Sequence, residues 1–556
     1  MSWFDDRPWL KTLDLPAEEA VPLEASTPLR DLAATVAASP DVAAWNHYGA
    51  SATYAEFDRQ STAFAAYLVE SGIQPGDAVG VYAQNSPHFL IATYGIWKAG
   101  AVIVPLNPMY QDELTHVFTD ANVKAVIVQH ALFLMRVKDY VADIPLVVQI
   151  GDLDWAENGP EAVFGPYRDL PEIPLPDLKT LVEERLDTDF VPLDMQPEDP
   201  ALIGYTSGTS GRAKGAVHAH ANISSNSRMA ARNAGLPPGS GIVSLAPLFH
   251  ITGFICQMIA SVASGGTLVL NHRFDPTSFL ELLKRERPAF MAGPATVYTA
   301  MMASPAFDAD AFSSFHSIMS GGAPLPEGLV KRFEEKTGHY VGQGYGLTET
   351  AAQAVTVPRG MRAPVDPESG NLSTGLPQRD AMVRILDDAG NPLGPREVGE
   401  VAIAGPMVAQ QYLNNQKATE EALPGGELRT GDVGFMDEDG WLFIVDRKKD
   451  MINASGFKVW PREVEDVLYT HPAVREGAVV GVPDEYRGET VVAQVSLQPG
   501  AEASPQDIID HCKQHLASYK ALVEVTIVDE LPKTSSGKIL RRTVRDEATQ
   551  ARTATA

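Results

Sequence analysis

A run of small, hydroxyl-bearing and glycine residues leads to a lysine: Tyr205-Thr206-Ser207-Gly208-Thr209-Ser210-Gly211-Arg212-Ala213-Lys214-Gly215. The run follows an apolar strand expected over Ala201–Tyr205. Its glycines let backbone N–H groups curl around a phosphate, and its hydroxyls add donors. Lys214 supplies a compact positive charge where polyphosphate charge is highest. The run is not a Walker loop, because no Gly-Lys-Ser/Thr follows its first glycine at that motif's spacing. These residues predict a phosphate-binding loop of another kind.

Basic residues gather at two other places in a chain that is acidic overall. The formal net charge is −27 at pH 7, which argues against a general nucleic-acid-binding or anionic-membrane-binding surface. Positive charges are nevertheless concentrated at Arg447-Lys448-Lys449 and at Lys533, Lys538, Arg541 and Arg542. A charge cluster by itself usually indicates only a solvated face. Anionic substrates, however, would need local basic groups of this kind to offset the acidic field.

The elements that must position these residues follow one repeated order of apolar strand, loop and helix. Short, continuous apolar strands alternating with helices are typical of parallel sheets covered on both faces, so we expect two doubly wound α/β layers. The strands expected in the first layer are Val79–Ala83, Ala101–Pro105, Ala125–Gln129 and Leu146–Ile150, and those in the second are Ile242–Leu245, Thr267–Leu270, Ala289–Ala292 and Ser317–Ser320.

The pattern changes after Thr374. Two apolar strands, Met382–Leu386 and Glu400–Ile403, flank a turn-rich segment and predict antiparallel hairpins in a small barrel-like subdomain. The C-terminal part is expected to fold as a separate small α/β domain. Its expected elements are a helix starting at Pro461, strands at Val479–Val482, Val491–Leu497 and Val523–Ile527, and a helix capped by Ser504; the tail from Thr543 is expected to be loose.

Taken together and in this order, the segments resemble the adenylate-forming superfamily of acyl-CoA synthetases, amino-acid adenylation domains and beetle luciferases. The resemblance covers the chain roughly from Asp31 to Arg542 and is closest to bacterial long-chain fatty-acid–CoA ligases. The phosphate loop departs from the usual family pattern in Ser210, where Thr is usual, and in Ala213, where Pro is usual. The other matching segments are Pro247–Phe254, Ser320–Pro324, Gln343–Glu349, Thr430–Asp432, Asp446–Asp450, Ala454–Glu465 and Pro532–Leu540.

The resemblance implies two domains with different tasks. Residues 1–446 would form a large N-terminal adenylation domain, which contains the two doubly wound layers and the barrel-like subdomain. Residues 447–556 would form a small, mobile α/β domain that carries the catalytic lysine, Lys538. Lys449 would be the pivot about which the small domain rotates between the two half-reactions.

The resemblance also implies a role for individual residues. The expected catalytic residues are Lys538, Thr348, Glu349 and Lys214, and Glu349 and Thr206 would hold Mg²⁺. The residues expected to bind ATP or AMP are Thr206, Ser207, Gly208, Thr209, Ser210, Gly211, Lys214, Gly322, Ala323, Pro324, Gln343, Gly344, Tyr345, Gly346, Thr348, Asp432, Arg447 and Lys538. His250, Phe254 and Gly321 would line the acyl pocket, and Ser455, Gly456 and Phe457 would line a tunnel for CoA.

The expected reaction uses ATP, CoA and a medium- to long-chain fatty acid, with acyl-AMP as the intermediate. Alternatives are a short-chain or aryl acid–CoA ligase, an enzyme that loads a carrier protein, a luciferase-like oxidase, and an inactive homologue that binds a nucleotide or lipid. No carrier domain follows the lysine segment, which favours free CoA.

The sequence also indicates where the protein works. Cys256 and Cys512 lie far apart without metal-ligand spacing, and the segment Met1–Arg7 lacks the pattern of a signal peptide, so a cytoplasmic protein is expected. Peripheral membrane contact and a homodimer stay open.

Overall fold

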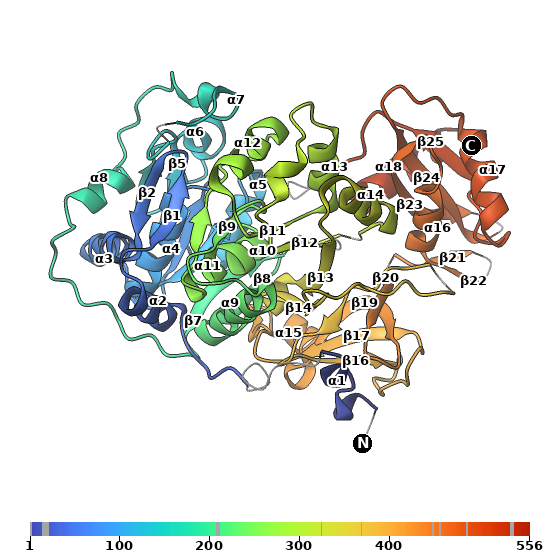
Figure 1. The fold of residues 1–556 in the computed structure, drawn as a ribbon, viewed down its shortest axis with the longest axis horizontal. Coiled ribbons are helices and arrows are strands. Elements are labelled where there is room, and N and C mark those ends of the chain that lie inside the picture. Colours follow the sequence, from blue (N-terminus) through green and yellow to red (C-terminus); the bar gives the residue numbers. More distant parts are fainter. Residues whose placement is uncertain are drawn as a thin grey trace.

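The computed structural model describes residues 3–13, 22–156, 158–206, 212–323, 325–368, 370–447, 450–454, 457–484, 487–533 and 539–555. Two large mixed sheets, a small antiparallel sheet and a separate C-terminal sheet make up the fold, with the small C-terminal domain at one end of the molecule (Figure 1). Among the described residues, no helix is long and apolar enough to cross a membrane.

The first large sheet contains the four strands expected for the first layer. Its order is β18-β8-β7-β4-β3-β5-β6, and neighbouring strands from β7 to β6 run parallel. The two remaining strands pair antiparallel, β8 with β7 and β18 with β8. The bounds are β3 (Ala78–Tyr82), β4 (Val102–Leu106), β5 (Ala125–Gln129), β6 (Leu146–Ile150), β7 (Pro200–Tyr205), β8 (Gly215–Ala219) and β18 (Gln411–Tyr412).

The second large sheet contains the four strands expected for the second layer. Its order is β15-β14-β13-β12-β11-β9-β10-β1-β2, with a parallel centre from β13 to β1 and antiparallel strands at both edges. The bounds are β1 (Ala43–His47), β2 (Ala50–Thr53), β9 (Gly241–Val243), β10 (Thr267–Val269), β11 (Phe290–Gly293), β12 (Ser317–Gly321), β13 (Val341–Leu347), β14 (Ala352–Thr356) and β15 (Leu376–Pro377).

Helices buried between the two sheets join them into one core. Every residue of α4 (Pro87–Lys98) is buried, as expected for a helix with protein on all sides. One hydrophobic cluster contains residues of both sheets together with α4 and the helical segment 254–263. The helices and helical turns of the N-terminal part are η1 (Trp3–Asp6), α1 (Trp9–Leu13), α2 (Pro28–Ala38), α3 (Tyr54–Glu70), α4, α5 (Asp112–Asp120), α6 (His130–Leu132), η2 (Phe133–Val137), α7 (Glu161–Phe164), η3 (Gly165–Tyr167), α8 (Leu178–Glu183), α9 (His220–Ala234), α10 (Ile251–Gly253), η4 (Phe254–Ile259), α11 (Ala260–Ala263), α12 (Pro276–Glu286), α13 (Ala295–Ala303), η5 (Ala309–Phe312), α14 (Glu327–Thr337), η6 (Thr348–Thr350), α15 (Gln416–Ala422) and η7 (Pro424–Gly426).

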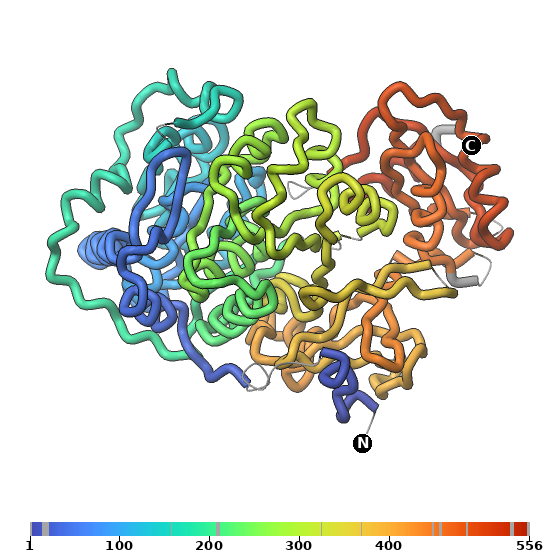
Figure 2. The backbone as a smooth tube through the Cα atoms, viewed as in Figure 1, coloured from blue at the N-terminus to red at the C-terminus, as the bar shows by residue number. Residues whose placement is uncertain are grey.

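The expected hairpins form a small antiparallel sheet next to the N-terminal segment. Its order is β16-β17-β19-β20, with β16 (Met382–Leu386), β17 (Gly399–Ala404), β19 (Leu428–Met436) and β20 (Leu442–Arg447). The blue N-terminal segment lies against this orange sheet (Figure 2), where the Thr12 hydroxyl donates to the Asp439 carbonyl over 2.8 Å. The strand β20 leads towards the small domain.

The C-terminal domain has its own sheet and core, as expected. Its strands are β21 (Ile452–Ala454), β22 (Phe457–Val459), β23 (Val474–Asp484), β24 (Gly488–Leu497) and β25 (Glu524–Ile527), and its helices are α16 (Pro461–Leu468), α17 (Pro505–His515) and α18 (Arg541–Thr555). The predicted helix starts at Pro461 and Ser504 are confirmed, and the Ser504 side chain caps α17.

The expectation of a loose tail from Thr543 is wrong, because α18 occupies it. Val544 is fully buried and packs with Ala478 and Val480 of β23, while Ala548 packs one turn further on. Val544 and Ala548, four positions apart in a polar segment, give only a weak sequence signal for a helix. The apolar surface that they pack against includes residues of β23.

Four buried histidines make the fold sensitive to acid. Burial lowers the pKa of His47 to about 3 and the pKa of His218, His220 and His272 to about 4. Below the ordinary histidine pKa of about 6.5, the unfolded chain takes up protons that the folded chain does not. The free energy of unfolding should therefore fall as the pH drops from 6.5 to 5, approaching about 1.4 kcal/mol per pH unit for each histidine.

Urea unfolding at a series of pH values measures this slope, and His220→Phe provides the matched control. Neither ring nitrogen of His220 has a hydrogen-bond partner among the described residues, and the ring packs on Trp97 with centroids 5.6 Å apart. The variant should lose one histidine's share of the slope without losing a hydrogen bond. A free energy of unfolding that stays constant from pH 6.5 to 5 would contradict the assignment.

Candidate active site

The predicted phosphate loop connects two paired strands next to the edge strand β18 of the first sheet. The strands β7 and β8 form an antiparallel hairpin, and the Thr206 amide donates to the Lys214 carbonyl over 2.9 Å at the base of the loop. Residues Ser207, Gly208, Thr209, Ser210 and Gly211 lie outside the described residues. The hairpin thus places Thr206 and Lys214 opposite each other where the loop begins and ends.

Lys214 and Glu349 contact one tyrosine, Lys214 at its ring face and Glu349 at its hydroxyl. The Lys214 ammonium lies over the Tyr412 ring, 4.7 Å from its centroid, and the Tyr412 hydroxyl donates to Glu349 Oε1 over 2.6 Å. Burial, and next the Glu349 carboxylate, raise the pKa of Tyr412, so its hydroxyl stays a donor. The structure therefore brings the predicted lysine and the predicted metal-binding carboxylate together through a residue that sequence reasoning missed.

The helical turn η6 that carries Thr348 and Glu349 is fixed from the first sheet. His218 Nε2 lies 2.8 Å from the Thr348 carbonyl, which can only accept, so Nε2 carries the hydrogen. The Asn226 amide donates to the carbonyls of Thr350 and Gln353 over 3.0 and 2.9 Å. These buried contacts give the turn a fixed position relative to β8 and α9.

A close backbone approach explains one of the predicted glycines. A Cβ atom at Gly346 would lie 1.8 Å from the Ala352 carbonyl oxygen, so β13 and β14 can pair there only without a side chain. The glycine is therefore needed for the pairing of β13 with β14 just before η6.

Asp432 connects β13 to the end of β20. The Tyr345 hydroxyl donates to Asp432 Oδ2 over 2.7 Å, and Arg447 Nε lies 3.4 Å from Asp432 Oδ1. Burial, and next the Asp432 carboxylate, raise the pKa of Tyr345 well above its ordinary value. Three residues predicted to contact the nucleoside are thus in one connected group.

Facing residues of β12 and β13 carry buried polar atoms that are left without a hydrogen-bond partner in the described part of the chain. Ser320 and Gln343 face each other in register on these strands, and both are buried. Ser320 Oγ and Gln343 Oε1 have no hydrogen-bond partner among the described residues. Buried polar atoms are seldom left unpaired in proteins, so this pair of residues fits a polar ligand such as a nucleotide base. Gly321, Gly322 and Ala323 follow directly, and Pro324 lies outside the described residues.

Two of the predicted acyl-pocket residues, His250 and Phe254, lie where the π-helical turn η4 begins, and the third, Gly321, is the last residue of β12. Phe254 is fully buried and packs edge-on against Phe89 and Trp97, with ring centroids 6.5 and 6.0 Å apart. His250 caps the short helix α10, where its Nδ1 accepts from the Thr252 amide over 3.3 Å. Gly253 is needed because a Cβ atom there would lie 2.1 Å from the Pro247 carbonyl oxygen. Single-turn π-helices inside longer helices occur frequently at functional sites.

The junction with the small domain is a network of buried charges around Asp446. This carboxylate accepts from the Arg462 amide over 2.9 Å and from Arg541 Nη1 over 2.9 Å. Arg541 also donates from Nη2 to Glu465 over 2.5 Å, and Glu465 accepts the Val479 amide over 2.9 Å. Although burial alone would lower it, the carboxylates of Glu465 and Asp446 raise the pKa of Arg541.

Several predicted residues of the small domain cannot be located. Lys449, Ser455, Gly456 and Lys538 lie outside the described residues, and of Phe457 only the backbone, at the start of β22, is described. Their roles and the boundary between residues 446 and 447 stay predictions. Arg541, which follows the lysine segment, is described and donates to Asp446.

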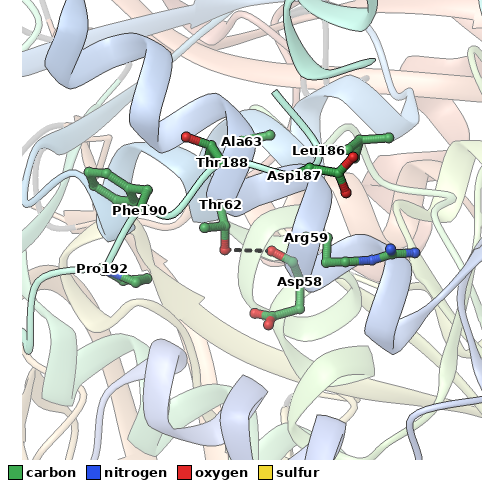
Figure 3. Close-up of a pocket in the computed structure, with 9 residues that line it drawn as sticks. All are labelled: Asp58, Arg59, Thr62, Ala63, Leu186, Asp187, Thr188, Phe190 and Pro192. Atoms are coloured by element: carbon green, nitrogen blue, oxygen red, sulfur yellow. Dashed lines mark hydrogen bonds between the residues drawn. The ribbon is translucent and has the colours of Figure 1, made fainter. Parts of the chain in front are cut away.

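A shallow cavity elsewhere does not belong to this site. It has a volume of about 460 Å³ and lies between α3 and the connector after α8 (Figure 3), at the end of the molecule opposite the small domain (Figure 1). Its Asp58 carboxylate already pairs with the buried Lys98 ammonium over 2.6 Å. The cavity contains none of the predicted site residues; it is lined by Asp58, Arg59, Thr62, Ala63, Leu186, Asp187, Thr188, Phe190 and Pro192.

Comparisons with known proteins agree with this geometry. The family of AMP-binding enzymes matches residues 32–413, and the C-terminal domain of AMP-binding enzymes matches residues 463–538. The chain is 34% identical to a long-chain-fatty-acid–CoA ligase of Bacillus subtilis over 98% of both chains, and 35% identical to a feruloyl-CoA synthase of an Amycolatopsis species over 91% of this chain and 96% of that one.

The chain belongs to the adenylate-forming acyl-CoA ligases. A solved structure of the anthranilate CoA ligase AuaEII in complex with anthranoyl-AMP superimposes with a TM-score of 0.85 at 26% identity, covering 97% of this chain and 99% of that one. This similarity confirms the predicted fold class, a large α/β N-terminal domain followed by a smaller C-terminal one.

The donor set of this ligase fits a magnesium ion held mainly by its substrate. Mg²⁺ usually takes one or two protein carboxylates and fills its other positions with phosphate oxygens and water. Glu349 offers such a carboxylate beside Lys214, and the described residues contain no group of three or more His, Cys, Asp or Glu that could hold a metal alone. Glu349 and Thr206 would therefore hold Mg²⁺ together with ATP, where the ion would offset phosphate charge.

Sequence reasoning missed Tyr412, His218 and Arg541 in this ligase for one reason. Each acts through a partner far away in the chain: Tyr412 through Glu349, His218 through Thr348, and Arg541 through Asp446. A signal existed only for Arg541, which was noted as part of a basic cluster without an assigned partner.

The Arg541 network gives a stability prediction for the small domain of the ligase. Arg541→Ala leaves the buried Asp446 and Glu465 carboxylates without their cation, so the free energy of unfolding should fall by about 3 kcal/mol. Hydrogen exchange at the Val479 amide, which donates to Glu465, measures this change locally. Arg542→Ala is the control, because its exposed pair with Asp546 at 3.8 Å should contribute less than about 0.5 kcal/mol. Equal effects of the two substitutions would contradict the network.

Proposed function

We propose that this AMP-forming acyl-CoA ligase activates medium- to long-chain fatty acids. The observation that carries the proposal is the arrangement of Lys214 and Glu349 around Tyr412. The buried side-chain oxygens of Ser320 and Gln343, which have no partner among the described residues, support a nucleotide site. The fatty-acid part is supported by the relatives that are named long-chain-fatty-acid–CoA ligases, such as those of Bacillus subtilis and Salmonella typhimurium, at 34% and 36% identity.

In the proposed first step, a carboxylate oxygen attacks the α-phosphorus of ATP and pyrophosphate leaves. The phosphate loop from Thr206 to Gly211 and Lys214 bind the leaving phosphates, and Thr348 donates to the α-phosphate. Lys538 reaches in from the small domain, bridges the carboxylate and the α-phosphate, and stabilises negative charge as it moves to the pyrophosphate. Because the acid itself is the nucleophile, no covalent intermediate with the protein forms.

The nucleoside is held by the group around Asp432. A carboxylate can accept hydrogen bonds from both ribose hydroxyls, and Arg447, which lies 3.4 Å from Asp432, can reach the ribose itself. The side chains of Ser320 and Gln343 and the backbone from Gly321 to Pro324 then lie along the adenine. These assignments give the buried side-chain oxygens of Ser320 and Gln343 a partner when ATP is bound.

In the proposed second step, the thiol of CoA attacks the acyl carbon and AMP leaves. The small domain, residues 447–556, rotates about Lys449, carries Lys538 away and presents Ser455, Gly456 and Phe457 to the pantetheine arm. The N-terminal domain, residues 1–446, keeps the adenylate in place. The reaction is proposed to take place in the cytoplasm.

A second candidate is an aryl acid–CoA ligase. Phe254 is fully buried against Phe89 and Trp97. If Phe254 lines the acyl pocket, a ring fixed in this way would favour a short aryl acid over a long acyl tail. The feruloyl-CoA synthase among the relatives, at 35% identity, acts on an aryl acid by its name. In the leading proposal Phe254 turns aside when a fatty acid binds, and in the second candidate it stays as a fixed wall.

An assay of CoA consumption across a panel of acids distinguishes the two. The panel runs from acetate to palmitate and includes benzoate, ferulate and anthranilate. Each buried CH₂ group contributes about 0.8 kcal/mol, so kcat/KM should rise about fourfold per carbon from butyrate upward until the tail fills its site. If kcat/KM were highest for an aryl acid, aryl acids would take the place of fatty acids as the proposed substrates. If none of the acids led to AMP release, the result would favour an inactive homologue.

A further inference from the structure

We propose that Tyr412 is a positioning residue that keeps Lys214 and Glu349 apart and orients the Glu349 carboxylate towards the metal ion of ATP. The inference rests on the proposed roles of Lys214 and Glu349, and it gives a task to a residue outside the motifs that the sequence offers. Tyr412 itself touches neither substrate nor metal in this account.

Both the hydroxyl and the aromatic ring of Tyr412 make a contact. Its hydroxyl donates to Glu349 Oε1 over 2.6 Å, and its ring lies under the Lys214 ammonium at 4.7 Å. A hydrogen bond from a hydroxyl to a carboxylate is charge-assisted, and an ammonium over an aromatic face is attracted to the ring's negative quadrupole. The same side chain therefore fixes a carboxylate at its tip and a cation on its face.

The segment around Tyr412 is held firmly enough to act as a spacer. On one side it pairs with β8, where the Gln410 amide donates to the Val217 carbonyl over 2.9 Å and the Leu413 amide to the Gly215 carbonyl over 2.7 Å. On the other side the Ala409 amide donates to the Glu349 carbonyl over 2.8 Å. Both the backbone and the carboxylate of Glu349 are thus set by residues 409–412.

The distance between the Lys214 ammonium and the Glu349 carboxylate matters because the two charges would otherwise pair with each other. The cation precedes β8 and the carboxylate lies in η6, and both contact the same phenol. Removing the phenol would leave them free to form a direct ion pair. Such a pair would occupy the lysine that the phosphates need and the oxygens that a magnesium ion needs. With Tyr412 in place, no described residue donates to Glu349 Oε2, which remains available for the metal.

The residues beside a metal ligand commonly tune its affinity. Groups that hydrogen-bond to a ligand orient it, and their loss typically costs 10- to 100-fold in metal affinity. Tyr412→Phe keeps the ring under Lys214 but removes the donor to Glu349. Tyr412→Leu removes both the ring face and the donor. The two substitutions therefore separate orientation of the carboxylate from separation of the charges.

The test measures binding without acid or CoA, so its result does not depend on which acid is the substrate. A non-hydrolysable ATP analogue is titrated by calorimetry without metal, and Mn²⁺ is then titrated into the analogue complex by electron paramagnetic resonance. Tyr412→Phe should bind the metal-free analogue within twofold of the natural chain and Mn²⁺ about tenfold more weakly. Tyr140→Phe is the matched control, because it removes another hydroxyl–carboxylate bond of 2.6 Å, to Asp112, and should change neither affinity.

A double substitution tests the separation of charges. Tyr412→Leu should weaken metal-free analogue binding about tenfold, and Tyr412→Leu combined with Glu349→Gln should restore it, because Lys214 then has no carboxylate to pair with. Failure of the double variant to recover would overturn the spacer role.

Glu349→Gln alone distinguishes this inference from the proposed function. Loss of Mn²⁺ binding in Glu349→Gln together with unchanged binding in Tyr412→Phe would overturn the role of Tyr412 and leave the metal site in place. Unchanged Mn²⁺ binding in Glu349→Gln would overturn the role proposed for Glu349, and the role of Tyr412 with it.

Discussion

The pairing of the two-residue strand β18 with β8 is the contact on which the site depends. It joins Gln411 to Val217 and Tyr412 to Ala216, residues that are far apart in the chain. Through this pairing Tyr412 lies between Lys214 at the end of the phosphate loop and Glu349 at the turn after β13. The two large sheets meet here, because Lys214 directly precedes a strand of the first sheet and Glu349 follows a strand of the second. A small element thus determines how far apart the charges of the two sheets are.

Holding opposite charges near each other without neutralising them is the physical problem of this enzyme. The chain has a net charge of −27, and its proposed substrates are all anions. The described cations of the site each have a partner that limits their motion: Lys214 has an aromatic face, Arg447 has Asp432 at 3.4 Å, and Arg541 has two buried carboxylates. An aromatic face holds an ammonium more weakly than a carboxylate does, and this leaves Lys214 the one best able to exchange its partner for phosphate.

Much of the fold could be predicted from the sequence because the parallel strands are continuous apolar runs. Strands such as β5, Ala125–Gln129, agree with the expected bounds to the residue, since a fully buried strand has no polar alternation to blur its ends. The phosphate loop and the turn at Glu349 could be recognised because each is a short, contiguous sequence motif. The tail was predicted wrongly because α18 depends on contacts between Val544 and β23 that no local pattern contains. Tyr412 and His218 were missed for the same reason, as each has its function through a partner brought close by folding.

The central claim is that the acid itself attacks the α-phosphorus of ATP, and the fate of one oxygen atom tests it most directly. The enzyme is supplied with a fatty acid labelled with ¹⁸O in both carboxylate oxygens, together with ATP, Mg²⁺ and CoA, and the products are weighed by mass spectrometry. Attack on the α-phosphorus followed by thiolysis must leave one ¹⁸O in the phosphate of AMP and one in the acyl-CoA carbonyl. Label in inorganic phosphate, with ADP as the nucleotide product, would contradict the account.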